Sequence, residues 1–296
     1  MSLTRRQTLS ILGGGAVLAA SAGTGYAVTR TPTAAIAPWA AAGGYDDPRK
    51  FALSYAILAP NPHNRQPWLV DLAREGEVTL YVDTDRLLPE TDPFSRQIVI
   101  GLGCFLEVFR MAAAEVGFQT EMDLFPQGMP EDALDKRPVA FIRLSPGGTP
   151  DPLFAQVPHR RTLKEPYDTS LEVPEATLAA IARAAMTTQV ATTNDPDTVL
   201  ALRHLSHEAL RIEIETPHTY KESVELFRIG HREVNANPDG IDFSGPLFEA
   251  MHLTGMFNRE VVMDPTSTAY KEGLKAVYAN ADTCLLYTSD AADEDC

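Results

Sequence analysis

The sequence is poor in cysteine and in positive charge. Its 296 residues include three cysteines, and two of them, Cys284 and Cys296, lie close to the end. The 40 aspartates and glutamates outnumber the 25 lysines and arginines, which gives a formal net charge of −15. This balance argues against nucleic acid or an anionic membrane as a partner, because both bind through basic surfaces. Without residues 284–296, only Cys104 remains and no intrachain disulfide can form.

Two common signatures of ligand-binding enzymes are also absent from the sequence. There is no G-x-G-x-x-G fingerprint, which argues against a Rossmann-type dinucleotide domain. The seven histidines are scattered, and no carboxylate-flanked zinc pattern surrounds the pair His204 and His207. We therefore predict that the chain has no metal site and that these two histidines are surface residues.

The first 28 residues have the pattern of a targeting segment. Arg5 and Arg6 form a twin-arginine pair, and the uncharged residues 9–28 behind it are rich in Gly, Ala and Ser. Such segments direct export, so we expect passage through the twin-arginine machinery to a periplasmic or other extracytoplasmic location. Residues 9–28 are marginal for a membrane span, which leaves a membrane anchor open as the alternative. Residues 29–45, rich in Ala, Thr and Pro, are predicted to be a linker.

The rest of the chain mixes helical and strand patterns, which predicts an α+β fold. The predicted strands are residues 68–72, 78–83, 122–125 and 139–144. The predicted helices are residues 48–59, 96–116, 174–185, 196–215, 217–229 and 269–279. A Gly/Pro connection at residues 146–152 divides the chain into residues 46–150 and 151–283. Gly101 and Gly103 each cost a helix about 1 kcal/mol, so we expect close packing of that helix against a neighbour.

The most distinctive stretch is residues 59–68, Ala-Pro-Asn-Pro-His-Asn-Arg-Gln-Pro-Trp. Its prolines disfavour helix and predict a rigid turn between a helix and a strand. Asn64 and Gln66 each offer amide donors and an acceptor, which suit the edge of a planar heteroaromatic ring. By composition alone, an ordinary Asn/Pro loop with a core tryptophan is the simpler interpretation.

A second polar stretch, residues 159–167, gathers positive charge in this acidic chain. Arg160, Arg161 and Lys164 fall close together, with the hydroxyl of Thr162 between them. Arginine binds an anion such as phosphate through forked hydrogen bonds and lysine binds it as a point charge. A solvated basic loop is the alternative, because the spacing alone is not specific.

Both stretches resemble elements of the nitroreductase family. Residues 59–68 are similar to its flavin-binding turn, roughly A-P-S-x-x-N-x-Q-P-W, with Asn61 in place of the usual serine. Residues 160–164 resemble its R-x-S-x-[RK] element, which contacts the flavin phosphate and ring. The His63-Asn64 pair and the R-x-L-P-x-x-D-P-x-x-R pattern of residues 86–96 resemble the Acg-like branch, in which two nitroreductase-like halves are fused in one chain.

The resemblance, which covers residues 46–279, implies a nitroreductase-like fold. Its two related halves would mimic a homodimer within a monomer and would hold FMN in the cleft between them. The cofactor-binding residues implied are Asn64, Gln66, Arg160, Thr162 and Lys164. In the family a segment near residues 231–256 approaches the flavin as a lid, and here that segment is predicted to be a loop.

The implied activity is flavin-dependent reduction, in which hydride passes from NAD(P)H through FMN to a small nitroaromatic or quinone-like acceptor. The flavin carries this chemistry, so we assign no catalytic side chain. A non-catalytic flavin-binding or flavin-sequestering protein is the alternative, and an α+β domain without a cofactor is the third interpretation.

Residues 284–296 resemble a translated sequencing adapter. They contain neither Gly nor Pro, and they begin where the family continues with a further helix and strand. We therefore expect that this tail is not native and that the chain is C-terminally truncated within its second half. A genuine acidic tail is the alternative interpretation.

Overall fold

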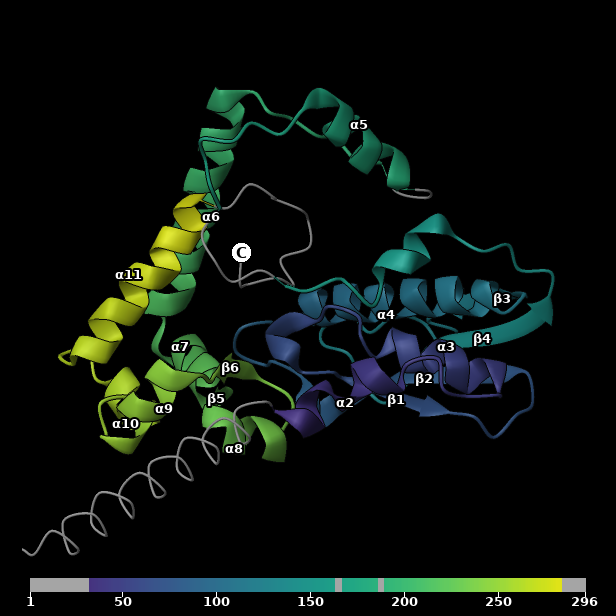
Figure 1. Cartoon of the computed structure of the whole chain (residues 1–296), viewed down its shortest axis with the longest axis horizontal. Coiled ribbons are helices and arrows are strands. Elements are labelled where there is room, and N and C mark those ends of the chain that lie inside the picture. The colour runs from purple at the N-terminus through teal and green to yellow at the C-terminus, as the bar shows by residue number, and fades with distance from the viewer. Residues whose placement is uncertain (1–31, 163–166, 186–188, 284–296) are drawn as a thin grey trace, which may run out of the picture.

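The computed structural model describes residues 32–162, 167–185 and 189–283. The predictions for the targeting segment 1–28, for Lys164 and for the tail 284–296 lie outside these residues. The described chain forms a region with a four-stranded sheet and a second, mostly helical region (Figure 1). This combination confirms the predicted α+β class.

The main sheet is antiparallel throughout and has the strand order β1-β2-β4-β3. Its strands are β1 (Trp68–Asp71), β2 (Glu77–Val82), β3 (Phe118–Leu124) and β4 (Pro138–Pro146). All four lie where strands were predicted, but β3 begins at Phe118 rather than at residue 122. The added residues pair with β4 from Arg143 to Pro146, so the partner strand extends a segment whose own pattern is weak.

Helices α3 (Pro48–Ala56) and α4 (Arg96–Glu115) cover one face of this sheet (Figure 1). The alternation in β2 points Val78, Leu80 and Val82 towards the helices, where Phe105 and Phe109 of α4 are fully buried. Full burial of each large apolar side chain contributes roughly 1.5–3 kcal/mol. Among the described helices, α4 has the length and apolarity of a membrane span, but 56% of that stretch is buried inside the protein.

The two glycines of α4 have different surroundings. A Cβ atom on Gly101 would lie 3.1 Å from Cβ of Asn61 and 3.2 Å from Cδ of Pro62, whereas one on Gly103 would meet nothing within 4 Å. Close packing therefore accounts for Gly101, which lets the 59–68 turn approach the helix, and it does not account for Gly103.

Alanine substitutions at these two glycines are expected to have opposite effects. Gly103→Ala should stabilise the fold by about 0.5–1 kcal/mol through helix propensity alone. Gly101→Ala should cancel that gain and destabilise by about 1–3 kcal/mol, because the added methyl group pushes against a proline-stiffened turn. Urea unfolding of both variants measures the difference, and an equal stabilisation by both would contradict the packing described here.

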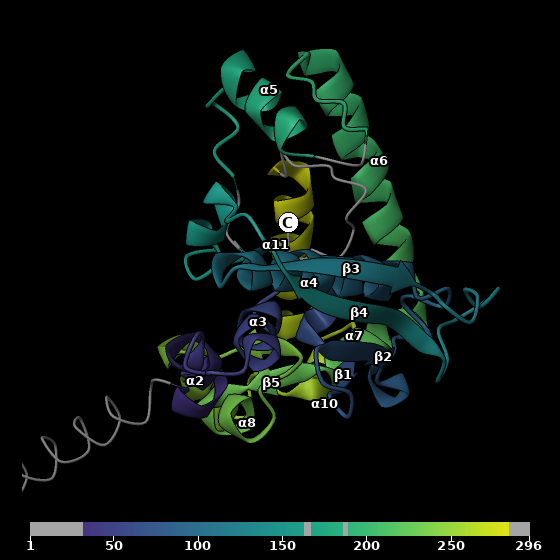
Figure 2. The same ribbon diagram turned by 90° about the vertical axis from the view of Figure 1, so that its right-hand side faces the viewer.

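The second region begins after the short 3-10 helix η3 (Pro152–Gln156). Its elements are α5 (Glu175–Ala184), α6 (Pro196–Glu215), α7 (Pro217–Glu225), β5 (Phe227–Ile229), α8 (Gly230–Ala236), β6 (Ile241–Phe243), α9 (Pro246–Leu253), α10 (Arg259–Met263) and α11 (Thr268–Thr283). Helices α5, α6 and α11 extend away from the main sheet (Figure 2). His207 of α6, predicted to be a surface residue, stacks on Tyr278 and approaches Asp282 at 2.8 Å.

Two secondary-structure predictions in this region were wrong. The helix predicted to end at residue 229 ends at Glu225, and β5 follows it. The loop predicted at residues 231–256 contains α8, β6 and α9. Strands β5 and β6 pair in parallel, with Phe227 and Phe243 in ring contact at 4.3 Å, so a tertiary contact decides the structure of both segments. In the described residues this region contains no second four-stranded sheet, and the relation between two halves stays a prediction.

The stability of the second region is expected to fall at alkaline pH because Tyr220 packs against its small core, which consists of Val224, Ile229, Phe257 and Val262. Tyr220 donates a hydrogen bond to the carbonyl oxygen of Val262 at 3.0 Å. Burial, aided by nearby Tyr270, raises the pKa of Tyr220 to about 12 from its usual value of 10.0.

We expect the contribution of Tyr220 to be complete below pH 10 and to fall as the pH rises to about 12. In that window the unfolded chain releases the phenolic proton and the folded chain retains it, so stability decreases with pH. Tyr220→Phe should unfold with a smaller loss of urea midpoint between pH 9 and pH 11.5. An identical loss in the variant and the parent chain would rule out this effect.

Candidate functional site

The turn at residues 61–66 has a strained backbone. His63, Asn64 and Gln66 have φ values of +46°, +48° and +49°, in the left-handed region that non-glycine residues seldom adopt. Each such residue costs of order 1–3 kcal/mol and persists only where its surroundings hold it. Inside the turn, Oδ1 of Asn61 accepts a hydrogen bond from the backbone N–H of Gln66 at 2.6 Å.

A second turn, residues 237–240, holds the first one from outside. Gln66 Nε2 donates to the carbonyl oxygen of Pro238 at 2.5 Å, and Asn64 Nδ2 approaches the same oxygen at 3.5 Å. The backbone N–H of Gly240 donates to the carbonyl oxygen of Asn64 at 3.3 Å. The two turns, from different regions of the chain, therefore form one structural unit.

A largely buried ion network ties this unit together. Nη1 of Arg65 lies 2.8 Å from Oδ2 of Asp239, and Nη2 of Arg228 lies 2.8 Å from its Oδ1. Nη1 of Arg86 lies 3.7 Å from Asp239, whose side chain is 11% exposed. Burial lowers the pKa of Arg65, and the nearby Asp239 carboxylate opposes that shift. Asp239 is thus the anion on which three guanidinium groups converge.

A pocket of about 420 Å³ lies against the two turns. Asn64, Gln66, Arg160 and Thr162, four of the five residues predicted to bind the cofactor, line it together. The fifth, Lys164, lies outside the described residues. The volume falls in the range of small-molecule sites, about 300–1,000 Å³. Sequence reasoning thus selected residues that the fold brings together, and their contact with a flavin stays a prediction.

The basic stretch reaches the pocket from the second region. Nη2 of Arg160 donates to the carbonyl oxygen of Leu58 at 2.8 Å, and Nη1 lies 3.4 Å from the hydroxyl of Thr162. The guanidinium of Arg161 lies over the ring of Trp39, 4.6 Å from its centroid. Two adjacent arginines therefore face different parts of the same pocket.

Sequence reasoning missed two contributors to the pocket. The first is α2 (Thr33–Ala41), a helix within residues 29–45, which were predicted to be a linker; Trp39 lies on it. One of only two tryptophans in an alanine-rich stretch was the available signal. The second is the pair Arg228 and Asp239, which no local pattern connects to the 61–66 turn.

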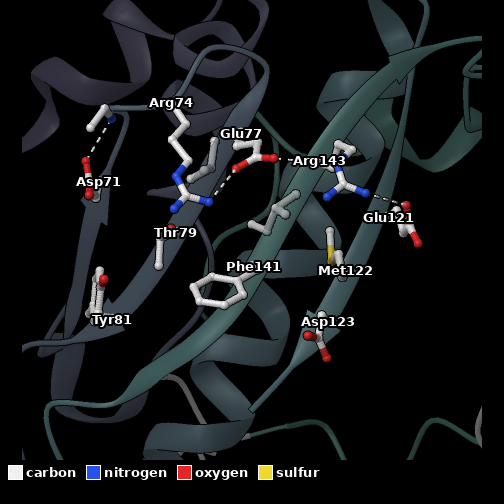
Figure 3. A pocket seen from close by; sticks show the side chains of 13 residues that line it. Asp71, Arg74, Glu77, Thr79, Tyr81, Glu121, Met122, Asp123, Phe141 and Arg143 are labelled. Atoms are coloured by element: carbon white, nitrogen blue, oxygen red, sulfur yellow. Dashed lines mark hydrogen bonds and ion pairs between the residues drawn. The ribbon is translucent and has the colours of Figure 1, made fainter. Parts of the chain in front are cut away.

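A larger hollow of about 680 Å³ lies on the other face of the main sheet (Figure 3). Two of its four acidic side chains pair with its two arginines: Arg143 lies 3.5 Å from Glu77 and 3.3 Å from Glu121, and Arg74 lies 3.6 Å from Glu77. None of the described residues predicted to bind a cofactor lines it. Among the described residues, no group of three or more His, Cys, Asp or Glu side chains could hold a metal ion. The pocket at the two turns is therefore the candidate site.

The chain is similar to several curated proteins, although no family model matches it. The chain is 33% identical over 127 residues to "Putative NAD(P)H nitroreductase acg" of Mycobacterium tuberculosis (strain ATCC 25618 / H37Rv), covering 41% of this chain and 38% of that protein. From the same organism it is 30% identical over 115 residues to "Putative NAD(P)H nitroreductase Rv3131", covering 39% and 33%. It is also 35% identical over 101 residues to "Uncharacterized protein Rv3127", covering 33% and 28%.

These similarities support a place for the chain near the nitroreductase family, as its two motifs indicated. The chain spans less than two fifths of the length of the curated relatives that it matches. Activity, cofactor and substrates therefore belong to the proposal that follows.

Proposed function

We propose that the pocket at the two turns binds FMN and that the protein is an oxidoreductase of the nitroreductase type. The observation that carries this proposal is the convergence of Asn64, Gln66, Arg160 and Thr162 on one pocket. The co-substrate would be NAD(P)H and the acceptor a small nitroaromatic or quinone-like compound. Bound flavin would supply the redox chemistry by accepting a hydride and passing two electrons to the acceptor.

The residues present fit a flavin mononucleotide. Asn64 and Gln66 provide amide donors and acceptors for the edge of a planar ring, and each amide nitrogen has two donor hydrogens. Gln66 Nε2 uses its two hydrogens on the carbonyl oxygen of Pro238 and on Oδ1 of Asn64 at 3.2 Å, so Asn64 Nδ2 is the amide nitrogen that keeps a donor for a ligand. Arg160 and Thr162, together with the predicted contact from Lys164, would hold the phosphate through charge-assisted hydrogen bonds. Gly101 keeps the strained turn close to α4, which fixes these amide groups in place.

The non-catalytic alternative draws on a different observation. The 237–240 turn closes on the amide groups through hydrogen bonds and a largely buried ion pair, as a fixed cover over a sequestered flavin would. Anaerobic mixing of the flavin-loaded protein with NADPH separates the two functions. Bleaching of the flavin absorbance supports the enzyme, and an unreactive flavin supports sequestration.

Two further parts of the proposal, export and a monomeric state, rest on the sequence. Export by the twin-arginine route follows from Arg5 and Arg6, and fractionation of cells that carry lysine at both positions tests it. A monomer with two related, flavin-clasping halves follows from the resemblance to the Acg-like branch. Sedimentation of the flavin-loaded chain tests the oligomeric state.

Titration of the purified chain with FMN and riboflavin tests the cofactor assignment. We expect FMN to bind about 10–100-fold more tightly, since hydrogen bonds to charged groups contribute about 1.5–3 kcal/mol each. Arg160→Gln should weaken FMN towards the affinity of riboflavin and leave riboflavin nearly unchanged, whereas Asn64→Leu should weaken both.

Arg183→Gln provides a matched control for these titrations. Arg183 is an exposed arginine on α5 that does not line the pocket, so its loss changes the net charge equally and should leave both affinities intact. Equal binding of FMN and riboflavin by the parent chain would contradict the phosphate assignment. Full flavin affinity in Asn64→Leu would contradict the role of the turn.

A further inference from the structure

We propose that Trp39 and Arg161 form the acceptor subsite of this pocket and that it prefers flat aromatic acceptors carrying one negative charge, such as a nitrobenzoate. This inference rests on the proposed function and names the class of acceptor that it would use. Trp39 lies outside both motifs that predicted the flavin contacts, and Arg161 occupies the unspecified second position of the R-x-S-x-[RK] element at residues 160–164.

Helix α2 gives the pocket an apolar wall. Ala35, Ile36, Pro38 and Trp39 line the pocket, and none of the residues of α2 is fully buried. The helix is held at its start, where the backbone N–H of Ala34 donates to Oδ1 of Asn235 at 3.0 Å. A wall of this composition suits an aromatic ring, since ligand sites are lined mainly by apolar and aromatic side chains.

Arg161 adds positive charge beside this wall. Its Nη1 donates to two backbone carbonyl oxygens, those of Pro158 at 2.9 Å and Arg160 at 2.6 Å, and its plane covers the Trp39 ring. No carboxylate of the described residues forms an ion pair with it. A guanidinium that stacks on an aromatic ring and is not paired with a carboxylate can bind a carboxylate or nitro group of a ligand.

The charges lining the pocket predict one negative charge on the acceptor. Three arginines of the described residues line it: Arg160 is assigned to the flavin phosphate and Arg228 pairs with Asp239, which leaves Arg161 for the acceptor. Asp242, which also lines the pocket, forms no ion pair within the described part of the chain. Its carboxylate should disfavour a second negative charge on the ligand.

The indole nitrogen of Trp39 lies inside the apolar wall and not at the surface of the pocket. Nε1 is buried and has no hydrogen-bond acceptor among the described residues. Buried donors without an acceptor are rare in proteins. Because this atom is inaccessible from the pocket, a ligand would contact the ring of Trp39 rather than its N–H group.

Tryptophan emission can test the subsite directly, because Trp39 and Trp68 are the only tryptophans. In a Trp68→Phe chain, quenching reports on ligands at Trp39 alone. We expect 4-nitrobenzoate to bind about tenfold more tightly than neutral 4-nitrobenzamide of the same shape, and the preference to shrink with added salt. If Trp68→Phe fails to fold, calorimetric titration of the parent chain and of Trp39→Leu replaces the emission measurement, and Trp39→Leu should lose most of the binding.

Two variants and a titration with added FMN show whether Arg161 binds the acceptor or the flavin phosphate. Arg161→Gln should abolish the preference for the nitrobenzoate, and Arg183→Gln should retain it. The preference should also persist in calorimetric titrations at saturating FMN. Its loss there would assign Arg161 to the flavin phosphate and overturn the inference.

If the chain binds FMN but does not prefer 4-nitrobenzoate, this inference is wrong and the proposed function stands. A chain that keeps the preference but binds no FMN would overturn the proposed function and leave Trp39 and Arg161 as a site for aromatic anions.

Discussion

Replacing Asp239 with alanine is expected to destabilise the fold by about 3–5 kcal/mol, the usual cost of removing one partner from a buried ion pair. The substitution leaves the guanidinium groups of Arg65, Arg228 and Arg86 facing one another without their shared carboxylate. The net stability of a domain is only about 5–15 kcal/mol, so the loss should be evident in the urea midpoint.

The same substitution should weaken flavin binding beyond its effect on folding. Arg65 lies between Asn64 and Gln66, and the backbone at both of these positions is strained. Without the contact to Asp239, the turn can relax and its amide groups lose their fixed positions. FMN titration at a temperature where the variant remains folded measures this effect.

Asp242→Ala is the matched control for Asp239→Ala. Asp242 lies on β6 near the same pocket but forms no ion pair within the described ranges, so its removal should change stability by about 0.5 kcal/mol or less. A double-mutant cycle with Arg65→Ala should yield a coupling energy of about 0.5–3 kcal/mol. Additive effects would show that Arg65 and Asp239 do not depend on one another.

Phe105→Ala is expected to be equally severe, at about 3–5 kcal/mol, for a different reason. Phe105 is fully buried in α4, and its ring centroid lies 5.0 Å from that of Trp68. Truncation should leave a cavity beneath the residue that closes the 59–68 turn. Calorimetric unfolding measures the stability loss, and FMN titration should show weaker binding because the turn loses its support.

Phe94→Ala is the control for Phe105→Ala, because it removes a phenylalanine ring that does not fill the core. Phe94 precedes α4 and is 53% exposed, so its removal should cost much less than that of Phe105. If Phe105→Ala and Phe94→Ala had similar melting temperatures, the core assigned to α4 would be wrong.

The pocket depends on contacts between distant parts of the chain. Asn64 and Pro238 are separated by 174 residues, yet one carbonyl oxygen contacts both amide side chains of the turn. The Arg65–Asp239 pair spans the same separation. A change in the second region, such as Asp239→Ala, can therefore alter a site whose recognisable motif lies entirely in the first.

The sequence by itself determined the elements whose signals are local. Period-2 alternation located β2, proline at the first helical positions located α3 and α6, and the prolines of residues 59–68 located the turn. The resemblance to two nitroreductase motifs selected Asn64, Gln66, Arg160 and Thr162, which the fold brings to one pocket. These features depend on backbone preferences and side-chain chemistry within a few residues, so a local pattern carries them.

Tertiary structure alone decided the rest. Strands β5 and β6 have three residues each, too few for an alternating pattern, and exist because Phe227 and Phe243 meet across a parallel pair. Helix α2 forms in a linker-like composition, where it contacts α3 and α8 and lines the pocket. Asp239 acquires its role only when three arginines from separate segments converge on it. The stability of each feature comes from long-range contacts, and a local sequence window contains one partner of each.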